Sequence, residues 1–112
     1  MHLTVVRADS SITHVAIVGR LDIDGVNQIA DRFVFTTTSG RTSALVDISQ
    51  VTFIASLGMG MLVGAAKAIQ RHGTKMVLVA PPHLVHDALV AAGIDHVIPI
   101  AASEAEALEM LR

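Results

Sequence analysis

The chain has 112 residues, of which 52% are hydrophobic and only 16% are charged. This balance excludes an intrinsically disordered chain, and the length fits a single domain that spans residues 1–112. The formal net charge of −2, without a cluster of lysine or arginine, excludes the basic surface on which nucleic-acid binding depends. No cysteine is present, so disulfides, thiol catalysis and cysteine-bound zinc are excluded as well.

No apolar run approaches the roughly 20 residues of a membrane span. The N-terminus MHLTVVRADSS also lacks the apolar segment of a signal peptide. We therefore expect a cytoplasmic protein without direct membrane insertion.

The first part of the chain predicts a hairpin followed by a helix. Two short runs of β-favouring residues, 3–7 and 12–19, flank a turn-prone stretch. Apolar residues between Val26 and Thr37 then recur at spacings of three and four, which is typical of one helical face, and Gly40 ends this helix.

The rest of the chain alternates between strands and helices. Its mostly apolar strands are of the kind that is buried on both faces of a parallel sheet. Glycines stop two of its helices, and a serine caps the last one. The predicted strands cover 43–48, 75–79 and 97–100, and the predicted helices cover 57–72, 83–92 and the residues after Ser103.

The resulting order, β-β-α-β-α-β-α-β-α, predicts an α/β fold with a mixed, mostly parallel sheet and right-handed crossovers. Only the N-terminal strand is expected to run antiparallel. In such sheets the functional surface lies beyond the carboxyl ends of the strands. Two loops are expected there, over residues 19–24 and 51–60.

These two stretches resemble the STAS domain of bacterial anti-sigma-factor antagonists. The resemblance begins with GRLD in the first loop, continues through VDISQVTFI and SLGMG, and ends with LVAAGIDHVIPI. It covers nearly the whole chain in the right order. Its most specific part is the segment from Leu45 to Gly60.

The resemblance implies a regulatory protein-binding module that is not an enzyme and needs no cofactor. In that family a serine directly after an aspartate at the start of the second helix is phosphorylated by a partner that is both a serine kinase and an anti-sigma factor. That serine corresponds to Ser56, the later glycines to Gly58 and Gly60, and the acidic residue of the first loop to Asp22. The family's aspartate is replaced by Ala55, and Leu57 stands where Ser or Thr is common.

The expected partner-binding surface consists of residues from the two loops and the start of the second helix: Asp22, Asp24, Ala55, Leu57, Gly58, Met59 and Gly60. Read without the resemblance, Ser56 is an N-cap, because serine before an apolar helical run commonly satisfies a free backbone N–H. The two roles are compatible.

The sequence does not decide the oligomeric state, and a weak homodimer is left open.

The glycines of the second helix require an explanation, because each costs roughly 1 kcal/mol relative to alanine inside a helix. Gly58, Gly60 and Gly64 can serve close packing on the sheet or close approach of a partner. Met59 can be exposed beside them.

Other chemistry has little support. His83 and His86 lie three residues apart beside Asp87, but no third ligand for a metal is evident. Asp22, Asp24 and Asp47 form no expected carboxylate pair, and phosphate-binding glycine loops and nucleophile elbows are absent.

Two further hypotheses remain beside the anti-sigma-factor antagonist. STAS domains resembling this one also occur as subunits of membrane lipid-transport assemblies, and the alanine at position 55 fits such a role without phosphorylation. A small apolar or nucleotide ligand in the loop crevice is the third.

Overall fold

The computed structural model describes all residues 1–112 and contains one five-stranded sheet with the strand order β1-β2-β3-β4-β5. Strand β1 pairs antiparallel with β2, and all other neighbouring strands are parallel. The predicted α/β fold with an antiparallel N-terminal strand is therefore confirmed. No helix has both the length and the apolar character needed to cross a membrane.

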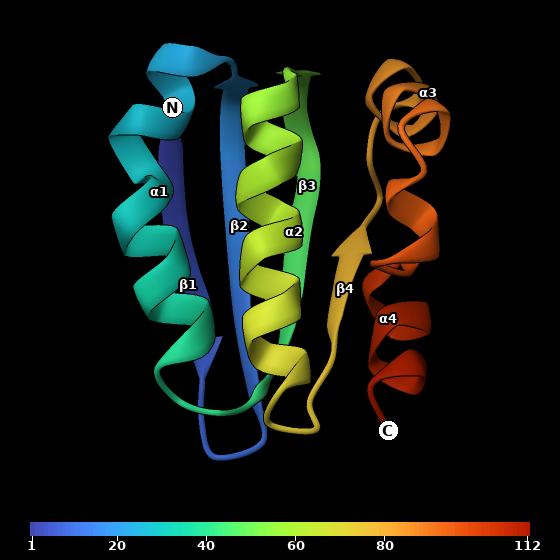
Figure 1. The fold of residues 1–112 in the computed structure, drawn as a ribbon. Coiled ribbons are helices and arrows are strands. Elements are labelled where there is room, and N and C mark those ends of the chain that lie inside the picture. The colour runs from blue at the N-terminus through green and yellow to red at the C-terminus, as the bar shows by residue number, and fades with distance from the viewer.

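The elements follow in the predicted order (Figure 1). The strands are β1 (His2–Ala8), β2 (Ile12–Leu21), β3 (Ser43–Ile54), β4 (Met76–Val79) and β5 (Ile100–Ala101). The helices are α1 (Ile23–Thr38), α2 (Ser56–Gln70), α3 (His83–Ala91) and α4 (Glu104–Met110), with a short 3-10 turn, η1, over Ile94–His96.

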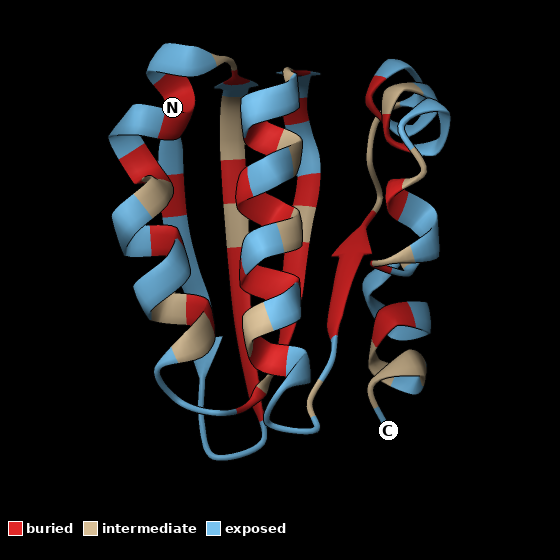
Figure 2. Ribbon diagram, viewed as in Figure 1, coloured by how far each residue is buried: buried red, intermediate tan, exposed pale blue.

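Two hydrophobic cores lie on opposite faces of the sheet. The larger has 23 buried residues and lies between one face and the helices α1, α2 and α3; Phe33 and Leu62 are among its fully buried side chains. The smaller has six, including Leu45 and Ala107, and is covered by α4. Alternation along β3 explains this division, because Ala44 and Val46 join the first core while Leu45 joins the second. Figure 2 shows buried residues alternating with exposed ones along α1 and α2, whereas β4 is buried throughout.

Two predicted boundaries are wrong at the carboxyl ends of the central strands. Residues 51–54 were expected in a loop but belong to β3, and β2 extends past Gly19 to Leu21. The two extensions pair with each other: Gly19 lies opposite Val51, and Leu21 opposite Ile54. The register between the strands shifts after Asp47, and pairing continues beyond the polar Ser49 and Gln50.

The last strand is also misplaced, because it covers Ile100–Ala101 and not 97–100. The backbone N–H groups of Val97 and Ile98 both donate to the carbonyl oxygen of Ile94. They are therefore unavailable to the sheet. Pro99 contributes no N–H, and its carbonyl accepts the bond from Leu78.

Candidate functional site

The candidate site lies where β2 and β3 end. Leu21 and Ile54 are direct partners in the sheet, and the N–H of Ala55 donates to the carbonyl oxygen of Leu21 at 2.9 Å. Asp22 and Ser56 follow these residues, so both lie at the same edge of the sheet, as predicted. In Figure 1 this is the upper edge, where α1 and α2 begin.

Asp22 is the N-cap of α1. Its Oδ1 accepts a hydrogen bond from the N–H of Gly25 at 2.8 Å, and its Oδ2 lies 3.4 Å from Nε of Arg20. The Gly25 hydrogen bond, helped by the Arg20 guanidinium, holds the pKa of this carboxyl below its ordinary value of 3.8. Asp22 thus shapes the loop, while Asp24 in the first turn of α1 is exposed.

The lowered pKa predicts a pH-dependent effect of Asp22→Asn. The carboxylate stabilises the folded protein above its unfolded-state pKa, and this contribution is lost as the pH falls through the lower folded-state pKa. Asparagine can still accept the hydrogen bond from Gly25 but carries no charge. The stability difference between wild type and variant should therefore be larger at about pH 6 than in acid.

Urea unfolding at both pH values measures this difference. A difference that stays constant across the acid range would show that the charge of Asp22 does not stabilise the loop.

Ser56 is not the N-cap that its position before the helix suggested. The N-cap is Ala55, which makes no side-chain cap hydrogen bond, and Ser56 is the first helical residue. The chain enters the helix one residue earlier because Ala55 is held by Leu21, while its carbonyl accepts from Met59. Ser56 is exposed at the start of α2, as expected. Its hydroxyl makes no hydrogen bond within the chain.

The three glycines of α2 divide into two groups. A Cβ on Gly58 would lie 3.0 Å from the Leu21 carbonyl oxygen and 3.2 Å from Cγ1 of Ile54, so Gly58 serves close packing. At Gly60 and Gly64 nothing lies within 4 Å of such a Cβ. Internal packing therefore explains only the first. Met59 is half-buried against the larger core.

We expect Gly58→Ala and Gly60→Ala to change stability in opposite directions. The methyl group at position 58 crowds a carbonyl that is fixed by the Ala55 hydrogen bond. At position 60 it meets only solvent and should raise the free energy of unfolding by up to about 1 kcal/mol. Urea unfolding of both variants tests this; stabilisation by both would mean that Gly58 is not required for packing.

An apolar rim at this edge was not expected from the sequence. The first turns of the helices expose Ile23 (64%), Leu57 (47%) and Leu84 (77%), and Phe53 at the end of β3 is 40% exposed. Arg20 lies across from Phe53 in the sheet, with its guanidinium carbon 4.4 Å from the ring centroid. This cation–π contact forms only because both strands extend beyond their predicted ends. It could therefore not be predicted from the shorter strands.

The two histidines of α3, His83 and His86, lie beside the carboxylate of Asp87. Nε2 of His83 lies 3.2 Å from one carboxylate oxygen of Asp87, and Nδ1 of His86 lies 3.8 Å from the other. No group of three metal-ligating side chains converges in the structure. Asp47 lies well inside β3, where it accepts a hydrogen bond from Ser49, and is not brought to Asp22.

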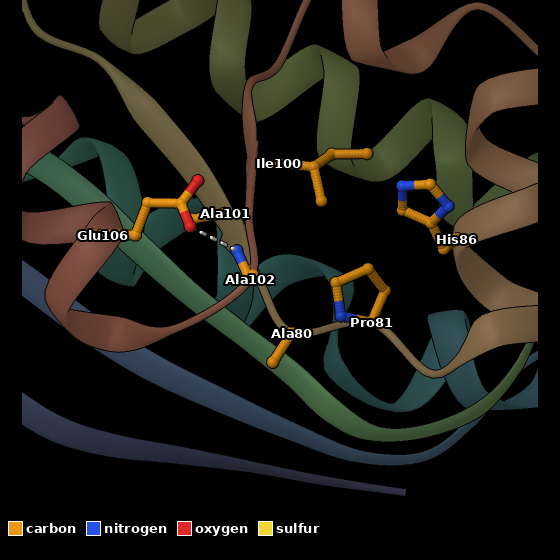
Figure 3. Close-up of a pocket in the computed structure, with 7 residues that line it drawn as sticks. All are labelled: Ala80, Pro81, His86, Ile100, Ala101, Ala102 and Glu106. Atoms are coloured by element: carbon orange, nitrogen blue, oxygen red, sulfur yellow. Dashed lines mark hydrogen bonds between the residues drawn. The ribbon is translucent and has the colours of Figure 1, made fainter.

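A separate hollow of about 390 Å³ lies beyond the ends of β4 and β5 (Figure 3). His86 and Glu106 lie on opposite sides of it, and the N–H of Ala102 donates to Glu106 at 3.4 Å. Ala80 lines it in a left-handed backbone conformation (φ 55°). No residue of the two loops, 19–24 and 51–60, lines this hollow, so it is not the loop crevice that was expected to hold a small ligand.

Solved structures share the fold over nearly the whole chain. An anti-sigma-factor antagonist (STAS) domain protein from Planctomyces limnophilus superimposes with a TM-score of 0.85, at 23% identity, over 98% of this chain and 97% of that one. SpoIIAA matches in its unphosphorylated form, where it is described as an anti-sigma factor antagonist, with a TM-score of 0.81, 19% identity and coverage of 99% and 96%. The phosphorylated form of SpoIIAA, from Bacillus, gives 0.72, 18%, 99% and 100%.

A membrane transporter contains a similar domain. The murine anion transporter Slc26a9 matches with a TM-score of 0.76 and 15% identity over 94% of this chain, which corresponds to 18% of the transporter. At these identities the likeness establishes the fold alone. The family model described as the STAS domain matches residues 4–107. The chain therefore belongs to the STAS domain family.

Proposed function

We propose that this STAS domain acts in the cytoplasm as an anti-sigma-factor antagonist, without catalytic activity of its own. Its partner is an anti-sigma factor with serine kinase activity, and phosphorylation of Ser56 switches the contact. The surface comprises Asp22, Asp24, Ala55, Leu57, Met59 and Gly60; Gly58, which was expected on it, is instead buried against the ends of β2 and β3. The observation that carries the proposal is the exposed Ser56 at the first position of α2, within the apolar rim.

The chemistry of this position supports a switch. The first N–H groups of a helix have no intrahelical partner, and the helix dipole favours negative charge there, so a phosphate on Ser56 is compatible with the fold. The same phosphate would place about two negative charges beside Leu57, one of the exposed apolar side chains of the rim. A partner that covers these apolar side chains would have to desolvate the charge, which weakens the contact.

A second candidate is a subunit of a membrane transport assembly. Ala55 in place of the family's aspartate favours it, and part of the Slc26a9 anion transporter shares the fold of this chain. Such a role needs a protein contact at the same edge but no phosphorylation.

Purification of the tagged protein from its host, in the wild-type form and as Ser56→Asp, separates the two candidates. Mass spectrometry then identifies the partners and the modification state of Ser56. The first function predicts an anti-sigma factor with a kinase domain, phosphate on Ser56, and loss of the partner from the variant. Recovery of a permease and its ATPase with unmodified Ser56 would support the second and contradict the first.

A further inference from the structure

Arg20 is the permanent cation at the edge of the sheet that carries Asp22 and Ser56. It stands near the carboxyl end of β2. The other lysine and arginine side chains lie elsewhere: Arg7, Arg41 and Lys75 at the opposite edge, and Arg32, Lys67 and Arg71 in the later turns or at the ends of α1 and α2. Arg112 is paired with Glu109 at the end of α4. A negative charge added at Ser56 therefore shares its edge with Arg20 alone among these cations.

The guanidinium of Arg20 is oriented by its surroundings but most of its donors are free. Its carbon lies 4.4 Å from the centroid of the Phe53 ring, and its Nε lies 3.4 Å from Oδ2 of Asp22. The second contact is longer than the roughly 2.7 to 3.2 Å of a well-formed hydrogen bond. The two terminal nitrogens make no hydrogen bond within the chain, and the side chain is 61% exposed. The N–H groups that arginine uses for bidentate binding of carboxylate or phosphate are therefore available.

The backbone brings Arg20 and Ser56 to neighbouring positions. The N–H of Ala55 donates to the carbonyl oxygen of Leu21 at 2.9 Å, and Arg20 and Ser56 adjoin these two residues in the chain. The ring on which the guanidinium lies belongs to Phe53, three residues before Ser56, and β3 ends between the two. The guanidinium thus lies where the chain leaves β3 for α2, which begins at Ser56.

We propose that Arg20 exchanges Asp22 for a phosphate on Ser56 and holds this phosphate as an ion pair. The inference rests on the phosphorylation of Ser56 proposed above. A phosphate carries about two negative charges and three acceptor oxygens, whereas Asp22 offers one charge through a long contact, so the guanidinium gains by the exchange. Asp22 keeps the hydrogen bond that its Oδ1 accepts from Gly25, so α1 stays capped in both states.

The exchange moves charge without cancelling it. The phosphate adds about two negative charges while Asp22 loses its counter-ion, so the edge as a whole still becomes about two charges more negative. The exposed Asp24 and Asp87 take no part, because neither contacts Arg20 and Asp87 lies beside His83. A docked partner is therefore repelled at both loops, by the phosphate at the start of α2 and by the released carboxylate of Asp22.

Titration of the phosphate tests the proposal. Phosphoserine is incorporated at position 56 during synthesis of the full chain, and phosphorus NMR follows its second pKa, ordinarily about 6, at physiological salt. A paired cation favours the dianion, so Arg20→Gln should raise this pKa by about 0.5 or more relative to the wild-type background. Arg71→Gln is the matched control, because it removes the same charge at the C-cap of α2. That position is roughly 20 Å away along the helix, well beyond the screening length of about 8 Å, so the pKa should not change.

A second variant guards against an effect of altered folding. Arg20→Lys keeps the charge but loses the planar fork and the stacking on Phe53, so it should remain folded and give a pKa between those of the wild type and Arg20→Gln. The same pKa in the wild type and Arg20→Gln, or an equal rise in Arg71→Gln, would overturn the proposal. The phosphate is introduced without kinase or partner, so this result does not depend on whether the host modifies Ser56. Absence of the phosphate from the protein purified from its host contradicts the proposed function instead.

Discussion

Replacement of Gly25 by alanine is expected to destabilise the protein by about 3 kcal/mol or more, the upper end of what overpacking costs. Gly25 lies in the first turn of α1, where the helix passes directly over the end of β2. A Cβ at this position would overlap the carbonyl oxygen of Arg20 and crowd Met1. Backbone on one side of the contact must move, and the hydrogen bond from Gly25 to Asp22 moves with it.

Gly64→Ala is the matched control, because it makes the same chemical change in a helix with open space around the new methyl group. Its free energy of unfolding should rise by up to about 1 kcal/mol. Urea unfolding followed by circular dichroism compares the two variants with the wild type. A Gly25→Ala protein as stable as the wild type would mean that the loop carrying Asp22 relaxes freely.

Most of the fold could be predicted because its signals are local. The period of the apolar residues separates helices from strands, and strict alternation of the two implies a parallel sheet. Gly93 and Gly73, which were expected to stop helices, do adopt the left-handed conformation that suits a helix end. Ser103 caps α4 as predicted, with its side chain accepting a bond from Glu106.

The predictions from sequence are wrong where a contact with a residue distant in the chain decides the local structure. Val51 to Ile54 become strand because β2 continues alongside them, which their own sequence does not reveal. Ala55 becomes the N-cap because the Leu21 carbonyl holds its N–H. N-cap propensity alone favours serine over alanine, which is why the N-cap was predicted at Ser56. The tertiary contact between Ala55 and Leu21 overrides this propensity and moves the N-cap by one residue.

The candidate site shows the same division. Asp22 and Ser56 could be placed at one edge, because the carboxyl ends of neighbouring parallel strands lie together. The exposed Leu84 and the stacked pair of Arg20 and Phe53 could not, since their roles depend on side-chain exposure and cross-strand register. The sequence signal that was available and overlooked is Asp22 itself, an aspartate directly before a helical run.

Ser56→Asp is expected to weaken partner binding by about 100-fold, whereas Ser56→Ala should change it by less than about threefold. The alanine variant leaves an exposed apolar surface at the start of α2 intact. The aspartate places a carboxylate beside Leu57, where a docked partner must remove its water without supplying a compensating charge. Ala55 sharpens the contrast, because the native surface carries no acidic residue at that position to which a partner is already adapted.

Neither substitution should unfold the domain. The Ser56 hydroxyl makes no hydrogen bond within the chain, so alanine removes no cap, and a carboxylate in the first turn of a helix is favoured by the dipole. Melting curves of both variants therefore serve as the control for the binding titrations with the purified partner. Because both proteins remain folded, a loss of affinity confined to Ser56→Asp can come only from charge at the contact. Equal affinities for the two variants would place the contact away from Ser56 and leave this residue as the first residue of α2 and nothing more.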